Sequence, residues 1–348
     1  MNDNQYILRC IQLAENGLGK TYPNPMVGAV IVHQNEIIGE GWHQKTGEPH
    51  AEVHAIQSVK NTNLLKNATL YVSLEPCSHH GKTPPCSDLI IQYKIPKVVI
   101  GIQDFFAEVN GLGIQKLKNA GCEVILSSLQ KECFELNKRF FTFHQKKRPY
   151  IILKWAETDD GFIDKLRKSN KPEINWITHP YSKQLVHKWR SEEQAVLIGK
   201  NTALQDNPRL NIRTWTGQNV RIIIDRNLEI PSSFNVYDQS QKTIILNQTN
   251  SKTDGLTQYI KADFKNLPEE ICTILFEQNI QSVIIEGGRY TTQSFIDIGL
   301  WDEARVFISD KRFKQGIKAP SLKNQSLSLK KKIQEDDLFI YKNKSFYE

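Results

Sequence analysis

Two segments decide the fold of this chain, "GEPHAEVHAI" at residues 47–56 and "LEPCSHHGKTPPCSDLI" at residues 74–90. They bring together histidines, cysteines and glutamates, the residue types that bind and use a metal ion. A hydrolytic Zn²⁺ site takes three protein ligands and keeps its fourth position open for water. His50, Cys77 and Cys86 offer one imidazole and two thiolates. The sequence therefore predicts that these three residues hold a zinc ion.

Glu52 stands two residues after His50, in the first turn of a helix predicted over residues 50–60. His-x-Glu followed by Pro-Cys is the pattern of zinc deaminases, in which a glutamate moves protons beside a metal-activated water. We therefore predict that Glu52 is the catalytic proton shuttle. Eight residues separate Cys77 from Cys86, and this long loop suits a substrate larger than a bare nucleoside.

Other histidines in the two segments are weaker candidates. His54 lies one turn after His50, but "HAEVH" lacks the glutamate directly after its first histidine that the zinc-protease helix requires. We interpret it as a residue of the helix face. His79 and His80 are not needed by a site that already has three ligands. A purely structural Cys₂His₂ site is the main alternative for the whole cluster.

The charge distribution and the hydropathy of the sequence argue against nucleic-acid and membrane partners. The net charge is +7, but residues 311–348 carry +6 of it, so the other 310 residues are nearly balanced. We expect no nucleic-acid partner, since one or two cations suffice for a small phosphate ester. Apolar runs such as "VVIGI" at 98–102 are too short to span a bilayer, and the N-terminus does not resemble a signal peptide. We therefore expect a cytoplasmic protein without a membrane partner.

The alternation of apolar segments predicts two α/β domains, over residues 1–146 and 147–348, with the charged segment "QKKRPY" at 145–150 between them. For the first domain we expect three layers around a mixed sheet. Its strands are expected at 27–32, 36–42, 68–74, 97–102 and 122–126, and its helices at 5–18, 50–60, 86–93, 113–120 and 129–144. For the second domain, strands are expected near 150–156, 195–199, 220–225, 243–247, 282–286 and 303–308, and helices near 179–190, 268–279 and 290–298.

The segment "SVIIEGGRYTTQSFI" at residues 282–296 is the clearest signal in the second domain. A buried strand leads through two glycines into a helix, and glycines there let a phosphate approach the free N–H groups of the helix start. An ordinary turn explains the pattern equally well. It is not the spaced glycine fingerprint of dinucleotide-binding folds.

Three motifs of the first domain, "TYPNPMVGAVIV", "GWHQKTGEPHAEVHA" and "LEPCSHHGKTPPC", resemble the deaminase domain of the bifunctional riboflavin-biosynthesis deaminase/reductase family. The resemblance implies a cytidine-deaminase-like three-layer α/β/α fold. It also implies zinc on the three predicted ligands, with Glu52 as the proton shuttle. It further implies that the pyrimidine or its ribose phosphate contacts Asn24, His43 and Lys82.

The second domain is similar to the reductase domain of the same family, through "LKWAETDDGFI" (153–163), "NWIT" (175–178), "WRSEEQAVLIGKNTALQDNPRLNIR" (189–213), "VRIIID" (220–225) and "IIEGG" (284–288). That implies a dihydrofolate-reductase-like α/β fold and NADPH as the cofactor. By position, the cofactor contacts are Glu157, Trp176, Thr202, Asp206, Arg226, Gly288, Arg289, Tyr290, Thr291 and Thr292. The substrate contacts are Ile174, Arg190, Leu210, Arg213 and Glu286.

Three of these positions depart from the family pattern. Glu157 places a carboxylate near an anionic cofactor, which is unfavourable unless the side chain turns away. Ile174 stands where a serine is usual. Arg226 replaces a small polar residue, and we expect it to reach the extra phosphate of the cofactor.

The resemblance implies a two-step enzyme that removes an amino group from a diaminopyrimidinone ribosyl phosphate and then reduces the ribosyl chain to ribityl. We expect a homo-oligomer, dimer or tetramer. One alternative is a nucleic-acid base deaminase of the tRNA type. Another is a deaminase whose second domain only binds or acts as a scaffold.

Overall fold

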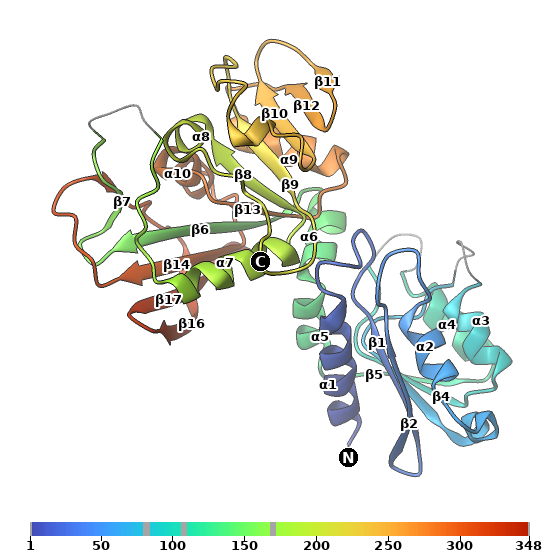
Figure 1. The fold of residues 1–348 in the computed structure, drawn as a ribbon. Coiled ribbons are helices and arrows are strands. Elements are labelled where there is room, and N and C mark those ends of the chain that lie inside the picture. Colours follow the sequence, from blue (N-terminus) through green and yellow to red (C-terminus); the bar gives the residue numbers. More distant parts are fainter. Residues whose placement is uncertain (1, 79–83, 106–109, 168–171, 347–348) are drawn as a thin grey trace. The chain divides into compact units, whose positions relative to one another are not determined.

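The computed structural model describes residues 2–78, 84–105, 110–167 and 172–346. The chain divides into two compact units, Met1–Lys147 and Arg148–Glu348, each with its own sheet (Figure 1). Within the described ranges, no helix is both long enough and apolar enough to cross a membrane.

The first unit is built on a five-stranded mixed sheet in the order β2-β1-β3-β4-β5. β1 pairs antiparallel with β2 and β3, whereas β3, β4 and β5 run parallel. Successive side chains of a strand point to opposite faces, so Ile31 packs with Ala55 of α2 while Val30 packs with Ile7 of α1. The predicted three-layer α/β/α fold is confirmed. The strands are β1 Gly28–His33, β2 Glu36–Trp42, β3 Thr69–Val72, β4 Lys97–Ile100 and β5 Glu123–Leu126.

Helices α1 and α5 lie on one face of this sheet, and α2, α3 and α4 lie on the other (Figure 1). The helix expected over residues 129–144 is two helices that break at Asn137, because that residue leaves helical geometry and uses its side chain elsewhere. The helix expected over 5–18 begins at Asp3 instead, where Asn2 and Gln5 form a capping box. The helices are α1 Asp3–Ala14, η1 Glu15–Gly17, α2 Ala51–Gln57, η2 Thr62–Asn67, α3 Cys86–Gln92, α4 Leu112–Asn119, α5 Gln130–Leu136 and α6 Lys138–Lys146.

The close contact between α2 and strand β2 depends on glycine. A Cβ atom on Gly41 would lie 2.4 Å from the Ala55 nitrogen and 2.6 Å from the Ala51 carbonyl oxygen. We expect Gly41→Ala to lower the free energy of unfolding by about 1–3 kcal/mol, because α2 must shift. The bound zinc should fall as well, since α2 begins directly after His50.

Urea denaturation and zinc analysis check this expectation. Gly47→Ala is the matched control, because its Cβ atom would meet nothing within 4 Å and only its φ of +84° is strained. We expect the control to keep its zinc. Wild-type stability together with wild-type zinc in Gly41→Ala would show that α2 does not need this close approach.

The second unit is built on a ten-stranded sheet in the order β11-β12-β10-β9-β8-β13-β6-β14-β17-β16. The seven strands from β12 to β14 are parallel, and β11, β17 and β16 pair antiparallel at the two ends. The strands are β6 Tyr150–Thr158, β8 Ala195–Gly199, β9 Val220–Ile224, β10 Thr243–Asn247, β11 Lys252–Asp254, β12 Thr257–Lys261, β13 Ser282–Ile285, β14 Glu303–Ser309, β16 Gln325–Ile333 and β17 Asp336–Asn343. A separate two-stranded sheet joins β7 Phe162–Asp164 to β15 Ile317–Lys318.

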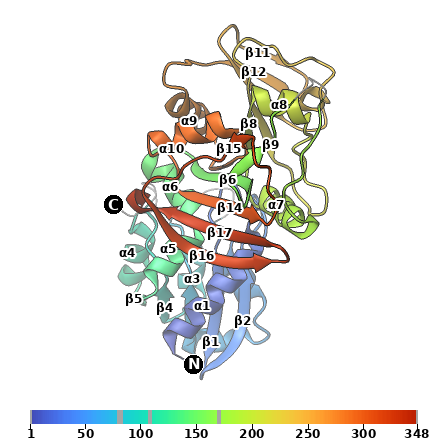
Figure 2. The same cartoon turned by 90° about the vertical axis from the view of Figure 1, so that its left-hand side faces the viewer.

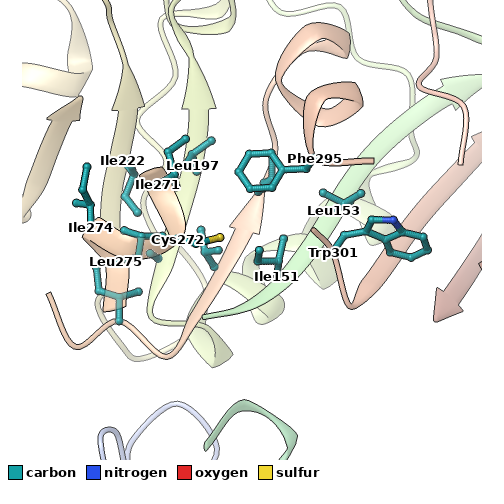
Figure 3. Packing of buried hydrophobic residues seen from close by; sticks show 14 of the residues in the cluster. Ile151, Leu153, Leu197, Ile222, Ile271, Cys272, Ile274, Leu275, Phe295 and Trp301 are labelled. Carbon is teal, nitrogen blue, oxygen red and sulfur yellow. The ribbon is translucent and has the colours of Figure 1, made fainter. Parts of the chain in front are cut away.

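Helices cover both faces of the long sheet. On one face, Leu275 of α9 (Leu267–Glu277) and Phe295 of α10 (Arg289–Asp297) belong to one apolar cluster, in which Phe295 lies near Leu153 (Figure 3). On the other face, Trp189 of α7 contacts Phe307, with ring centroids 5.4 Å apart. The predicted α/β class of the second domain is confirmed. The helices are α7 Pro180–Glu192, α8 Lys200–Asp206, η3 Asn235–Tyr237, α9 Leu267–Glu277, α10 Arg289–Asp297 and η4 Lys344–Phe346.

The hairpin of β16 and β17 was not expected from the sequence. It lies beside β14 at one end of the sheet (Figure 2), and nearly all of β16 is exposed. The hairpin also supports α7, because Asp336 accepts hydrogen bonds from the His179 N–H at 2.8 Å and the Ser182 hydroxyl at 2.5 Å. The start of α7 is therefore tied to β17.

Candidate active sites

The structure brings His50, Cys77 and Cys86 together. Their ligand atoms lie within 4.8 Å of one another, and His50 Nδ1 is 3.6 Å from Cys77 Sγ and 3.3 Å from Cys86 Sγ. His50 is the residue before α2, Cys77 lies in the loop after β3, and Cys86 is the first residue of α3. Three segments far apart in sequence thus place one imidazole and two sulfur atoms around a single point.

The pKa values of the two thiols and the imidazole in this cluster suit the binding of a metal cation. The hydrogen bond with Cys77 raises the pKa of the Cys86 thiol well above its ordinary range, and burial raises it further. The same thiol hydrogen bond lowers the pKa of Cys77, and the bond to Cys77 raises the pKa of His50 to about 9. The two sulfurs therefore do not both become thiolates unless a cation joins them. A soft dication such as Zn²⁺ fits this donor set and displaces the protons on binding.

Glu52 lies in the first turn of α2, and it is only 3% exposed. Its carboxyl group interacts electrostatically with the Cys86 thiol. Burial raises the pKa of Glu52, and the charge of His50 opposes that rise. A buried carboxyl group with a raised pKa can both accept and return a proton near neutral pH.

Asn24 and His43 form a second layer beside these residues. Asn24 Nδ2 lies 3.2 Å from His43 Nε2, and His43 Nδ1 lies 3.2 Å from the Pro49 carbonyl oxygen. The His43 ring meets the His50 ring edge-on, with centroids 5.4 Å apart. Lys82, like His79 and His80, lies outside the described residues.

Sequence reasoning missed Glu75, which is 4% exposed and stands two residues before Cys77. Its carboxylate accepts hydrogen bonds from the backbone N–H groups of Asp104 at 3.2 Å, Gly111 at 3.0 Å and Ile114 at 3.0 Å. It therefore fixes the Cys77 segment to the start of α4. The available signal in the sequence was its place between an apolar strand and Pro76-Cys77.

The second unit contains a cavity of about 1110 Å³ over the carboxyl ends of β8, β9 and β13. This edge is where parallel α/β sheets bind ligands. Thirteen of the fifteen residues predicted for this domain line the cavity. They are Ile174, Trp176, Arg190, Thr202, Asp206, Leu210, Arg213, Arg226, Glu286, Gly288, Arg289, Tyr290 and Thr291.

The two other predicted cofactor contacts are not among the lining residues. Thr292 is fully buried and donates its hydroxyl to the Gly287 carbonyl at 3.1 Å. Glu157 accepts a hydrogen bond from Trp155 Nε1 at 2.7 Å, and burial raises the pKa of its carboxyl group. The Glu157 side chain has therefore turned to Trp155, which removes the conflict with an anionic cofactor.

An ion pair of Arg190 and Glu286 lies at the wall of the cavity. Arg190 Nε and a terminal nitrogen donate to the two carboxylate oxygens at 2.7 Å and 2.8 Å, and Lys154 Nζ lies 3.6 Å from the same carboxylate. Burial alone would raise the pKa of Glu286, but the charges of Arg190 and Lys154 outweigh it and lower that pKa to about 2. Glu286 is therefore ionised.

Further basic residues that the sequence did not single out line the same wall. Lys183 Nζ lies 3.7 Å from the centre of the Trp176 ring, and His187 is buried. Burial and the charges of Arg190 and Arg213 lower the pKa of His187 to about 4. Lys154, Lys183, Arg190 and Arg213 thus surround the Glu286 carboxylate with positive charge, and this part of the cavity favours an anionic ligand.

Other predicted contacts already have partners within the unit. Burial raises the pKa of Asp206 to about 6, although Arg167 donates to it at 2.8 Å. Thr202 Oγ1 accepts from the Gly288 N–H at 3.0 Å, so that amide is already bonded at the start of α10. Arg226 Nε donates to Gln248 at 2.7 Å.

Comparison with known proteins agrees with both halves of this description. A family model described as the cytidine and deoxycytidylate deaminase zinc-binding region matches residues 1–102. A second model, described as the RibD C-terminal domain, matches residues 149–325. The predicted resemblance and the predicted fold of each domain are confirmed by these matches.

Whole-chain relatives cover nearly the full length. The riboflavin biosynthesis protein RibD of Aquifex aeolicus is 40% identical, over 97% of this chain and 98% of that protein. The protein of the same name from Escherichia coli is 34% identical, over 89% and 88%. A crystal structure of a diaminohydroxyphosphoribosylaminopyrimidine deaminase/5-amino-6-(5-phosphoribosylamino)uracil reductase from Thermotoga maritima is 36% identical, with a TM-score of 0.89 over 98% of each chain. The chain therefore belongs to the RibD family of bifunctional deaminase/reductase enzymes of riboflavin biosynthesis.

Proposed function

We propose that residues 1–146 hydrolyse the 2-amino group of 2,5-diamino-6-ribosylamino-4(3H)-pyrimidinone 5′-phosphate and release ammonia. Residues 147–348 then reduce the ribosyl group of the product to ribityl with NADPH, giving 5-amino-6-(5-phosphoribitylamino)uracil. The convergence of His50, Cys77 and Cys86 beside the buried Glu52 carries the first part. The deaminase and reductase activities of the Thermotoga maritima relative support the choice of substrate.

In the first reaction His50, Cys77 and Cys86 hold the zinc ion. When bound, zinc supplies a Lewis acid that lowers the pKa of water. The Glu52 carboxylate accepts the proton of the attacking water and returns it to the departing amino group. Asn24 offers a donor and an acceptor to the pyrimidine edge beside His43. Lys82 supplies a cation for the phosphate.

In the second reaction the cavity of the second unit holds cofactor and substrate together. NADPH supplies the hydride. Trp176, Thr202, Asp206 and residues 288–291 at the start of α10 contact the cofactor, and Arg226 contacts its extra phosphate. Arg190, Arg213, Leu210, Ile174 and Glu286 contact the substrate. Of the two arginines predicted for the substrate, Arg190 is paired with Glu286, so Arg213 binds the ribose 5′-phosphate.

The enzyme works as a homo-oligomer in the cytoplasm. None of the six cysteines, all of them in the described ranges, forms a disulfide, which suits a reducing compartment that also supplies NADPH. Its partners are small phosphorylated pyrimidines.

A coupled assay on the full chain tests both activities. Ammonia release is measured with the diaminopyrimidinone substrate, and NADPH oxidation is measured separately with the deaminated product. We expect Cys86→Ser to lose its zinc and its ammonia release but to keep NADPH oxidation, because the Cys86 thiol lies in the first unit.

Cys122→Ser is the matched control, because this cysteine lies outside the metal cluster. It should keep both its zinc and its ammonia release. Stoichiometric zinc in Cys86→Ser would show that the ligand set is different. A wild-type chain that oxidises no NADPH would leave the second unit as a binding or scaffold domain.

A further inference from the structure

The side-chain amide of Asn137 forms two hydrogen bonds with the backbone of Met26, a residue far away in the sequence. Its Nδ2 donates to the Met26 carbonyl oxygen at 2.8 Å, and its Oδ1 accepts from the Met26 N–H at 2.8 Å. Asn137 is 2% exposed and Met26 is 8% exposed. The amide thus pairs with Met26 as a neighbouring strand would, in a place shielded from water.

The position of Asn137 is itself fixed. It stands at the break between α5 and α6, where its backbone N–H donates to Phe134 and its carbonyl accepts from Phe141. Its conformation, φ −105° and ψ 22°, interrupts what would otherwise be a single helix. Because the helix is interrupted at Asn137, the side-chain amide of this residue lies against Met26.

The segment that Asn137 holds is the one that carries the pyrimidine-binding candidates. The Val27 carbonyl, next to Met26, accepts a hydrogen bond from the His43 N–H at 2.9 Å. Asn24, two residues before Met26, meets the His43 ring at 3.2 Å. His43 in turn contacts the Pro49 carbonyl and the ring of His50. A shift of Met26 would move both residues relative to the metal ligands.

We propose that Asn137 is a positioning residue of the deaminase site, which sets Asn24 and His43 at the right distance from His50. Its side-chain hydrogen bonds join it to Met26, so it acts on the site through that segment. This inference rests on the proposed deamination. It predicts that loss of the amide weakens substrate binding while the metal ligands stay in place.

The test uses Asn137→Leu, which keeps the volume but removes both hydrogen bonds, and Asn137→Asp, which keeps the size and the acceptor. Steady-state ammonia release gives kcat and KM, and the cobalt-substituted enzyme reports metal ligation through its absorption bands. We expect kcat/KM to fall by about 10–100-fold, mainly through KM, with unchanged cobalt bands. Asn137→Asp should lie between Asn137→Leu and wild type.

Asn343→Leu is the matched control. Asn343 is equally buried and donates to the Gly299 and Trp301 carbonyls at 3.2 Å and 2.8 Å, but it lies in the second unit. It should lower Tm without changing the KM for deamination. The proposal is overturned if Asn137→Asp has the wild-type kcat/KM, or if Asn137→Asp loses its cobalt bands together with its activity. It is also overturned if Asn343→Leu raises the KM for deamination as much as the Asn137 variants do. A wild-type chain that releases no ammonia contradicts the proposed function instead.

Discussion

Replacement of Glu52 by glutamine is expected to reduce ammonia release by about 10²–10⁴-fold, the usual contribution of a positioned acid or base. Glutamine has nearly the same shape but cannot take up the proton of the attacking water. Glu52 is not among the clustered ligand atoms, so the variant should bind as much zinc as wild type. The loss should therefore appear in kcat, with the metal content unchanged.

Ammonia release and zinc analysis of the same protein sample measure this result. Glu48→Gln is the matched control, because Glu48 is an exposed carboxylate two residues before His50. It should keep its activity. If Glu52→Gln turned over at the wild-type rate, another group would have to move the proton. If it lost zinc, the role of Glu52 would lie in holding the metal site.

Replacement of Glu286 by leucine is expected to destabilise the second unit by about 3–5 kcal/mol, because Arg190 is left buried without its partner. NADPH oxidation should be lost in the same variant, since Glu286 and Arg190 both line the cavity. The double variant Arg190→Met/Glu286→Leu should recover much of the stability but not the activity. Lys154 loses the same carboxylate partner in the double variant, and burial lowers its pKa.

Denaturant unfolding of the four proteins gives the interaction free energy of the pair. Additive effects of the two single replacements would show that the ion pair contributes little. The pH dependence provides a second check. Since the pKa of Glu286 is lowered from 4.5 to about 2, its contribution is complete above pH 4.5 and disappears as the pH falls toward 2.

The metal centre was predictable because its signal is local. His50, Glu52, Cys77 and Cys86 stand in short motifs whose spacing reflects one chemistry, and the structure brings the corresponding atoms together. The parallel strands of both units were predictable from their apolar runs, except β12, which was missed. Their pairing order and the extent of the second sheet were not.

Features that depend on distant partners were not predictable. Asn137 looks like an ordinary helix residue until its partner Met26 is known. Lys154 lies in the apolar strand β6, and only the fold places it beside Glu286. The hairpin of β16 and β17 was missed because β16 is almost fully exposed and its short Ser-Leu alternation at 326–329 gives way to three consecutive lysines.

The end strand β16 has a consequence for behaviour at high concentration. It borders the long sheet with one row of backbone N–H and C=O groups that no neighbouring strand of the sheet pairs. Such edges recruit strands from other chains and start aggregation, and lysines discourage it by their charge and hydration. Lys330, Lys331 and Lys332 lie in succession on this edge. The positive charge of β16 is thus expected to oppose edge-to-edge association of one chain with another.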